Sequence, residues 1–94
     1  MRFVDVSEKT KKKLKKFKSD KAVIEGFSRA LKELKTAPDP TIIGERKHGL
    51  YANCYGIHLT KNHSLVYMYI PKEDTVILID LDDHKNLYGR DNRS

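Results

Sequence analysis

The chain has 94 residues, 38% of them hydrophobic, which suits one small domain over residues 1–94 and is too short for two. No apolar run approaches the ~20 residues that span a bilayer, and the charged N-terminus lacks the apolar segment of a signal peptide, so we expect a cytoplasmic protein. Cys54 is the only cysteine, which excludes an internal disulfide, and no Cys/His cluster has zinc spacing.

Positive charge is concentrated in the N-terminal half. The net charge is +6, and residues 1–47 carry 14 Lys and Arg against 7 Asp and Glu, whereas residues 48–94 carry 5 against 6. A field of this sign attracts phosphate backbones, acidic membrane surfaces or acidic proteins. The charge alone does not choose between these partners.

The N-terminal residues predict a strand followed by a lysine-rich helix. Residues 2–6 suit a short strand, and Ser7 is a good N-cap for a helix that runs to about Lys18. Seven of the ten residues from Lys9 to Lys18 are lysines, which form either a solvated face or a contact for nucleic-acid phosphates. The RNA-binding candidates in this helix are Lys11, Lys12 and Lys15.

A second helix follows, and its signal is stronger. Ser19 or Asp20 caps it, and Pro38 ends it because proline lacks the N–H that a helix interior requires. Its apolar residues recur at the spacing of a single helix face; they are Val23, Ile24, Phe27, Ala30, Leu31 and Leu34. We expect Phe27, Leu31 and Leu34 to pack on a sheet, and the two helices to form an antiparallel hairpin across one face of it.

The C-terminal half predicts a three-stranded antiparallel meander. Its strands are expected at about Leu50–Leu59, Leu65–Ile70 and Thr75–Leu81, with a four-residue turn between the second and the third. Together with the N-terminal strand and the helical hairpin, this order predicts an α+β fold with the helices on one face of the sheet. Residues 39–49 are expected to form a loop.

Histidines gather at one edge of this predicted sheet. The end of the first meander strand, the start of the second and the end of the third lie at the same edge, where His58, Asn62, His63 and His84 occur. The first and third strand ends are roughly 10 Å apart, because neighbouring strands lie ~4.8 Å apart. Strand alternation places His58 on the face that the helices leave uncovered.

This set of residues suits the cleavage of RNA. Attack of a 2′-hydroxyl on the adjacent phosphate needs a base, an acid and a cation, and histidine can be either acid or base near neutral pH. We predict His58 as the base and His84 as the acid, although the sequence leaves the reverse order open. Arg46 and Lys47 are candidate phosphate contacts, and the chemistry needs neither a metal nor another cofactor.

Three segments of the C-terminal half carry a family resemblance. They are residues 49–59, Ser64-Leu65-Val66-Tyr67 and Asp83-His84-Lys85-Asn86-Leu87-Tyr88-Gly89. Together they are similar to the RelE/ParE superfamily of bacterial toxins, and most similar to its YafQ branch. His58 and His84 match the family's catalytic histidines, and Tyr88 stands where the family has a functional aromatic residue. Asn62-His63 replaces the family's Asp-Trp pair.

The resemblance implies the RelE-like toxin of a type II toxin–antitoxin system. Such a toxin is an mRNA interferase, a hydrolytic endoribonuclease that cuts mRNA in the ribosomal A site. The implied partners are a cognate antitoxin protein and the ribosome with its ribosomal RNA and mRNA, without a membrane. In this setting Tyr88 stacks on an RNA base or else closes the core. His63 either stacks on a base in place of the tryptophan, supplies a proton, or is a surface residue.

Two alternatives remain open at this stage. A ParE-like toxin inhibits DNA gyrase without cutting RNA, but such proteins lack the pair of histidines found here as His58 and His84. A degenerate toxin would retain antitoxin binding alone. The Asn62-His63 replacement keeps that possibility open, because an amide cannot accept a proton as the family's aspartate can.

Overall fold

The predicted strand, helical hairpin and three-stranded meander follow one another in the expected order, and the structure adds a short strand at Glu45–Arg46 and a short C-terminal helix at His84–Tyr88 that were not predicted. The computed structural model describes residues 2–47 and 51–88, the side chain of Tyr88 excepted. The elements are β1 (Phe3–Val6), α1 (Glu8–Lys16), α2 (Lys21–Thr36), β2 (Glu45–Arg46), β3 (Tyr55–His58), β4 (His63–Ile70), a short 3₁₀ helix (Pro71–Glu73), β5 (Thr75–Asp83) and α3 (His84–Tyr88). Within the described ranges no helix is long and apolar enough to cross a membrane.

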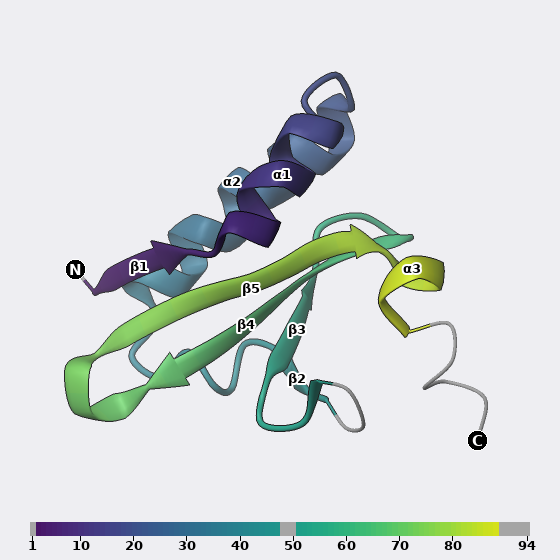
Figure 1. Ribbon diagram of the computed structural model, residues 1–94. Helices are drawn as coiled ribbons and strands as arrows, with labels where there is room; N and C mark the ends of the chain where they lie inside the picture. The colour runs from purple at the N-terminus through teal and green to yellow at the C-terminus, as the bar shows by residue number, and fades with distance from the viewer. Residues whose placement is uncertain (1, 48–50, 89–94) are drawn as a thin grey trace.

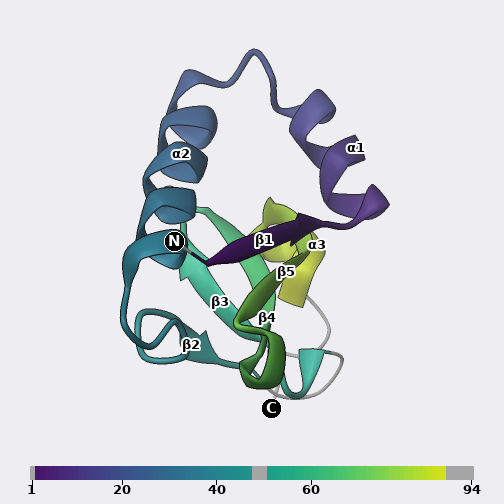
Figure 2. The same cartoon turned by 90° about the vertical axis from the view of Figure 1, so that its left-hand side faces the viewer.

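The strands form one mixed sheet in the order β1-β5-β4-β3-β2. β1 runs parallel to β5, whereas β5, β4, β3 and β2 pair antiparallel to their neighbours. Both long helices lie on the same side of the sheet, with α1 against β5 and α2 against β3 (Figure 1). The view in Figure 2 shows the two helices running in opposite directions from a shared connection. The predicted α+β fold is therefore confirmed.

The strand boundaries differ from the prediction in four places. β4 begins at His63 rather than Leu65, and β5 continues to Asp83 rather than ending at Leu81. β2 lies inside residues 39–49, which were expected to form a loop, and it pairs with β3 through Glu45 and Arg46. This edge strand carries charged side chains and no apolar alternation, so local sequence did not reveal it. β3 begins at Tyr55 rather than near Leu50, and residues 48–50 lie outside the described part of the chain.

Both helices begin at the predicted caps. The Ser7 hydroxyl accepts a hydrogen bond from the Thr10 N–H, and an Asp20 carboxylate oxygen accepts one from the Val23 N–H. Ser7 and Thr10 also close the edge of β5 beyond the end of β1, because both hydroxyls donate to β5 carbonyls, Ser7 to Ile79 at 2.9 Å and Thr10 to Leu78 at 3.0 Å. The start of α1 thus covers part of the sheet edge that β1 is too short to pair.

The main core lies between the helices and the sheet. Its buried members come from α2, β4, β5 and the residue that follows β3, and they are Val23, Ala30, Leu34, Leu59, Leu65, Tyr67, Val76, Leu78 and Leu81. Tyr55 and Ile57 pack against this cluster, as strand alternation predicted. On α2 the predicted face is rotated, since the buried positions are Val23, Gly26, Ala30 and Leu34. Phe27 and Leu31 are only partly buried at its margin.

A smaller cluster packs on the opposite face of the sheet, which was expected to be uncovered. It contains Tyr51, Cys54, Val66 and Leu87, so residues preceding β3 and part of α3 shield this face. Cys54 is 5% exposed, and burial raises the pKa of its thiol. A buried thiol with a raised pKa is a poor nucleophile, so Cys54 serves as a small core residue.

α2 approaches β3 more closely than a side chain would allow. A Cβ at Gly26 would clash with the Leu59 carbonyl oxygen, and glycine avoids this clash because it has no side chain. The Arg29 guanidinium, one turn further along α2, donates to the carbonyls of His58 and Leu59 at 3.3 Å each. This contact joins the helix to the end of the strand that carries His58.

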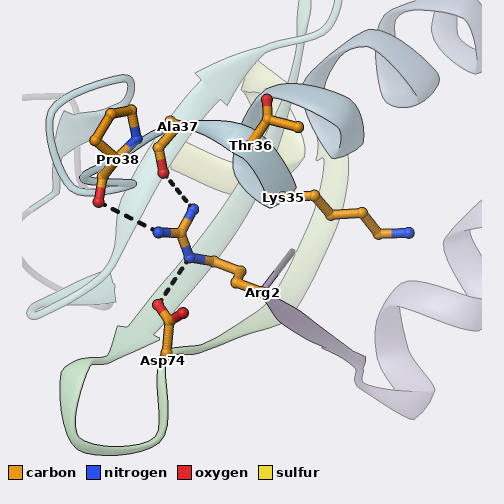
Figure 3. Close-up of a pocket in the computed structure, with 6 residues that line it drawn as sticks. All are labelled: Arg2, Lys35, Thr36, Ala37, Pro38 and Asp74. Atoms are coloured by element: carbon orange, nitrogen blue, oxygen red, sulfur yellow. Dashed lines mark hydrogen bonds and ion pairs between the residues drawn. The ribbon is translucent and has the colours of Figure 1, made fainter.

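At the far end of the sheet, Arg2 joins three segments. Its guanidinium donates to the Leu34 carbonyl at 2.7 Å. It also donates to the Ala37 carbonyl at 2.6 Å, and its Nε pairs with Asp74 at 3.0 Å (Figure 3). Asp74 also accepts a hydrogen bond from the Tyr69 hydroxyl. The carbonyls at the end of α2 thereby find a donor, as helix ends require. The pocket drawn in Figure 3 is therefore lined by residues that hold these segments together.

Two carboxylates on β5 are held by lysines of α1. Asp80 and Asp82 are each 2% exposed. The Lys13 ammonium lies 3.1 Å from Asp80 and 2.7 Å from Asp82, while Lys9 lies 3.3 Å from Asp80 and Lys16 lies 3.3 Å from Asp82. The three lysines are spaced i, i+4, i+7 and therefore share one helix face. The lysine-rich helix is thus part of the fold as well as a source of surface charge.

The ionisation of these groups reflects the pairing. Burial alone raises the pKa of Asp82, but the hydrogen bonds from Lys13 and from the Asp83 N–H outweigh it and lower that pKa to about 2. Burial opposes charge on Lys13 as well, yet the two carboxylates raise the pKa of its ammonium. Each charge therefore stabilises the other in the folded state.

We expect Leu34→Ala to destabilise the protein by about 2–5 kcal/mol, because it removes a fully buried side chain and leaves a cavity. Leu31→Ala is the matched control on the same helix, and it should cost clearly less because Leu31 is partly buried. Urea denaturation measures both free energies of unfolding. Equal losses would contradict the packing of α2 described above.

We expect Lys13→Met to cost about 2–3 kcal/mol, because it leaves two buried carboxylates short of a cation. The loss stays below that of a fully buried pair since Lys9 and Lys16 remain. Lys12→Met, at an exposed position of the same helix, should change stability by no more than about 0.5 kcal/mol.

The same pairing has a signature in acid. The folded pKa of Asp82 is lower than its unfolded value, so its contribution is complete above roughly pH 4 and is lost as the pH falls toward 2. Wild type should therefore lose more stability than Lys13→Met across this window. Parallel curves for the two proteins would contradict the assignment.

Candidate active site

A row of three side chains crosses the sheet on the face opposite the long helices. His58 on β3 pairs with Ser64 on β4, and Ser64 pairs with Asp82 on β5. Cross-strand partners point to the same face, so the three side chains are neighbours. His58 is exposed, whereas Ser64 and Asp82 are buried. The row therefore runs from solvent toward the carboxylate held by α1.

His84 joins this row from the first position of α3. Its Nε2 lies 2.8 Å from the Ser64 Oγ, and the Nδ1 of His58 lies 3.5 Å from the same oxygen. The two imidazole ring centroids are 5.1 Å apart, with the ring planes at 69°. The strand ends alone predicted roughly 10 Å. The two rings come this close because the residue between them, Ser64, has a small side chain that lets both rings pack above it.

The main chain fixes the position of His84. Its N–H donates to the Asn62 carbonyl at 2.8 Å, which ties the start of α3 to the turn between β3 and β4. The Asp83 carboxylate accepts from the Asn86 N–H at 2.8 Å, and the Asn86 side chain donates to Asp82 at 3.3 Å. α3 is therefore attached both to the β3–β4 turn and to the carboxylate that α1 holds.

The surroundings favour the neutral form of His84. Burial lowers the pKa of its imidazole, and the positive charges of His58, Lys47 and His63 lower it further. Asp83 acts in the opposite direction without reversing the shift. A histidine of this kind is available as a proton acceptor near neutral pH.

The other predicted site residues are divided between the two faces of the sheet. The His63 ring packs edge-on against Phe17, with centroids 5.2 Å apart, and its Nδ1 contacts the Thr60 hydroxyl at 2.8 Å. It is therefore on the helix side, away from His58 and His84. The Asn62 side chain is exposed, and its backbone makes the contact with His84 noted above.

Of the two predicted phosphate contacts, Lys47 lies on the side of the histidines. Arg46 pairs with Tyr55, whose side chain packs against the helical core, so Arg46 leaves the sheet on the helix side. Lys47 follows on the opposite side and forms an ion pair with Glu45 at 3.1 Å. Its positive charge helps to lower the pKa of His84. The prediction for Tyr88 concerns a side chain outside the described part, as does the whole of His48.

An open hollow of about 540 Å³ lies beside His58. It forms because β2 pairs only with Tyr55 and Gly56 and leaves the edge of β3 uncovered further along. Two acidic residues, Glu33 and Glu45, line it together with the apolar Ile57. The two carboxylates disfavour an anion inside this hollow, so it suits an uncharged group better.

Three residues of this site were not predicted from the sequence, namely Ser64, Asp82 and Lys13. Ser64 is a small polar residue immediately before the apolar run of its strand and two residues after Asn62, and that position was the available signal. Asp80 and Asp82 alternate on one face of a strand, and the lysines spaced i, i+4, i+7 were their natural partners. Within the described residues, no three His, Cys, Asp or Glu side chains are grouped as a metal ion would need.

Comparison with solved structures finds similar folds among toxins. The chain is similar to a metal-bound toxin from Helicobacter pylori, with a TM-score of 0.76, 22% identity and coverage of 93% of this chain and 99% of that one. It is similar to a histidine-to-glutamine mutant of YafQ from E. coli, with a TM-score of 0.76, 15% identity and coverage of 95% and 100%.

A third similar structure is the E. coli RelBE toxin–antitoxin complex, with a TM-score of 0.68, 25% identity and coverage of 88% of this chain and 96% of that one. No protein-family model matches the sequence, and no curated protein matches it significantly. The relationship is therefore carried by structure. The chain has the fold of the RelE/ParE superfamily of toxins, as the resemblance in its C-terminal half predicted, and YafQ is among its structural neighbours.

Proposed function

We propose that this protein is the toxin of a type II toxin–antitoxin pair and acts in the cytoplasm as a ribosome-dependent endoribonuclease. The observation that carries the proposal is the pair of imidazoles, His58 and His84, 5.1 Å apart around Ser64 on the face that the long helices leave open. Two groups that can each give or take a proton near neutral pH are what cleavage by a 2′-hydroxyl requires.

The proposed reaction uses the two rings in sequence. His84 removes the proton of the 2′-hydroxyl, the 2′-oxygen attacks the adjacent phosphorus, the bond from phosphorus to the 5′-oxygen breaks, and His58 protonates the departing oxygen. The products are a 2′,3′-cyclic phosphate and a free 5′-hydroxyl. We assign the base to His84, the reverse of the order predicted from sequence, because its lowered pKa favours the neutral ring.

Cations are available for the phosphate and for the RNA backbone. The positive charge of Lys47 lowers the pKa of His84, so this ammonium acts close to the histidine pair. It suits stabilisation of the phosphoryl oxygens. On α1 the candidate RNA contacts Lys11, Lys12 and Lys15 are exposed and lie off the face that holds Asp80 and Asp82. Arg46 is a candidate for RNA outside the cleavage point, and Tyr88 for stacking on a base.

The proposed partners are a cognate antitoxin and the ribosome. One similar structure is itself a toxin–antitoxin complex. A basic helical surface suits both ribosomal RNA and an acidic protein segment that folds on binding. A toxin that binds its antitoxin without cutting RNA is the second candidate, favoured by one observation: His63, in the place of the family's tryptophan, is turned to the helix side.

We expect His58→Gln and His84→Gln each to lower the rate of mRNA cleavage by ~10²–10⁴-fold, because each removes one acid–base group. Neither ring belongs to the main core, so antitoxin binding and folding should persist. The measurement is single-turnover cutting of mRNA on programmed ribosomes. Wild-type rates in both variants would refute the assignment, and a folded wild type that inhibits gyrase and cuts no RNA would place the protein with ParE-like toxins.

The order of acid and base has its own test within that experiment. A substrate with sulfur in place of the scissile 5′-oxygen has a leaving group that needs no protonation. It should restore cleavage by His58→Gln and leave His84→Gln slow. Rescue of His84→Gln instead would return the roles to the order predicted from sequence.

We expect replacement of Lys11, Lys12 and Lys15 by Gln to weaken ribosome binding and flatten its dependence on salt, because fewer counterions are released. The matched control replaces three exposed lysines elsewhere, namely Lys21, Lys32 and Lys72. Both variants lose the same charge, so only a local contact separates them. Identical salt slopes for the two variants would show that the α1 lysines make no specific contact.

A further inference from the structure

Ser64 is the residue that both imidazoles contact. It is 2% exposed, lies on β4 between the strands that deliver His58 and His84, and presents its Oγ to one nitrogen of each ring at 3.5 and 2.8 Å. A buried hydroxyl needs partners, and here the two imidazole nitrogens supply them. Neither ring can change its hydrogen bonding at this point without affecting the other.

We propose that Ser64 is a positioning residue whose hydroxyl links His58 and His84 into one unit that favours one charged and one neutral ring. A hydroxyl donates one hydrogen bond and accepts up to two. When one ring presents an N–H and the other a lone pair, the Ser64 oxygen accepts from the first while its proton goes to the second. All three groups are then satisfied. Two neutral rings can form the same contacts, but a charged ring donates the stronger, charge-assisted hydrogen bond, which favours the singly charged state.

The doubly charged state lacks this arrangement. Both rings would present an N–H to the Ser64 oxygen, and the hydroxyl proton would lose its acceptor in a buried place, which is costly. Two positive rings with centroids 5.1 Å apart also repel each other. The pair therefore titrates as a unit in two separated steps, and the state between the steps has one acid and one base.

Other charges surround the unit, and they stay in place when Ser64 is changed. Those acting on the rings are Asp83 at the end of β5, His63 at the start of β4, and Lys47 and Glu45 at the β2 edge. Asp82 completes the row and is held by Lys13 and Lys16 from α1. A change in titration on loss of the hydroxyl alone therefore reports on the link and not on these groups.

The test follows the ring signals of the histidines by NMR as a function of pH in the full-length protein. In wild type, the signals of His58 and His84 should both report the same two separated steps. In Ser64→Ala the two steps should move toward each other, because the singly charged state loses its hydrogen-bonded link and the doubly charged state loses its penalty. Ser64→Thr keeps the hydroxyl and should restore the separation.

A matched control uses the other hydroxyl–histidine contact. Thr60→Ala removes the partner of the His63 Nδ1, so it should alter the titration of His63 and leave the separation of the His58 and His84 steps in place. If Ser64→Ala does not fold, Ser64→Cys replaces it, because a thiol is a weak donor and acceptor. Unchanged separation in a folded variant that lacks the hydroxyl would overturn the proposal.

The consequence for cleavage rests on the proposed function and is measured separately. The pH–rate profile of Ser64→Ala should narrow, with both limbs displaced inward, since the active state lies between the two steps. A hydroxyl with a merely structural role would lower the whole profile without moving its limbs, and that result would overturn the proposal. Absence of cleavage in wild type would refute the nuclease assignment, while the NMR result would still decide whether Ser64 links the rings.

Discussion

The ammonium of Lys13 between two buried carboxylates is the interaction on which both the fold and the candidate site depend. Asp80 and Asp82 lie on β5, 67 and 69 residues from this lysine along the chain. Buried charges of one sign are costly unless they are paired. Detachment of α1 from the sheet would leave the two carboxylates without their cation and would therefore be unfavourable. Through Asp82 and Asn86 the same pairing reaches α3, which carries His84. A helix rich in lysine thus determines where a histidine stands on the other face of the sheet.

This arrangement divides the lysines of α1 into two groups. Lys9, Lys13 and Lys16 are engaged with the carboxylates, while the others remain on the surface. The charge available to a polyanion is therefore smaller than the sequence suggests. The sequence suggested that the lysines of this segment are either solvated or bind a partner. In the structure, one side of the helix has a third role, because its lysines pair with the buried carboxylates of β5.

The parts of the fold that local sequence determines were predictable. α2 follows from its apolar spacing and its Asp20 cap, and the meander follows from strand-length apolar runs separated by turns. β2 was not predictable, since two charged residues become a strand only by pairing with β3. In the site, strand order brought His58 and His84 to one edge, but their contact depends on the small size of Ser64. That His63 faces Phe17 also depends on packing that spacing alone does not specify.

The contact between Gly26 and the Leu59 carbonyl has a thermodynamic consequence for recognition. A helix and a strand that meet backbone to backbone, with Arg29 bonded to the same strand end, have little freedom to shift against each other. The end of β3 that bears His58 is therefore organised before any ligand arrives. Association at this edge gives up little conformational entropy, and affinity there is decided by how well the incoming group matches a surface that is already set.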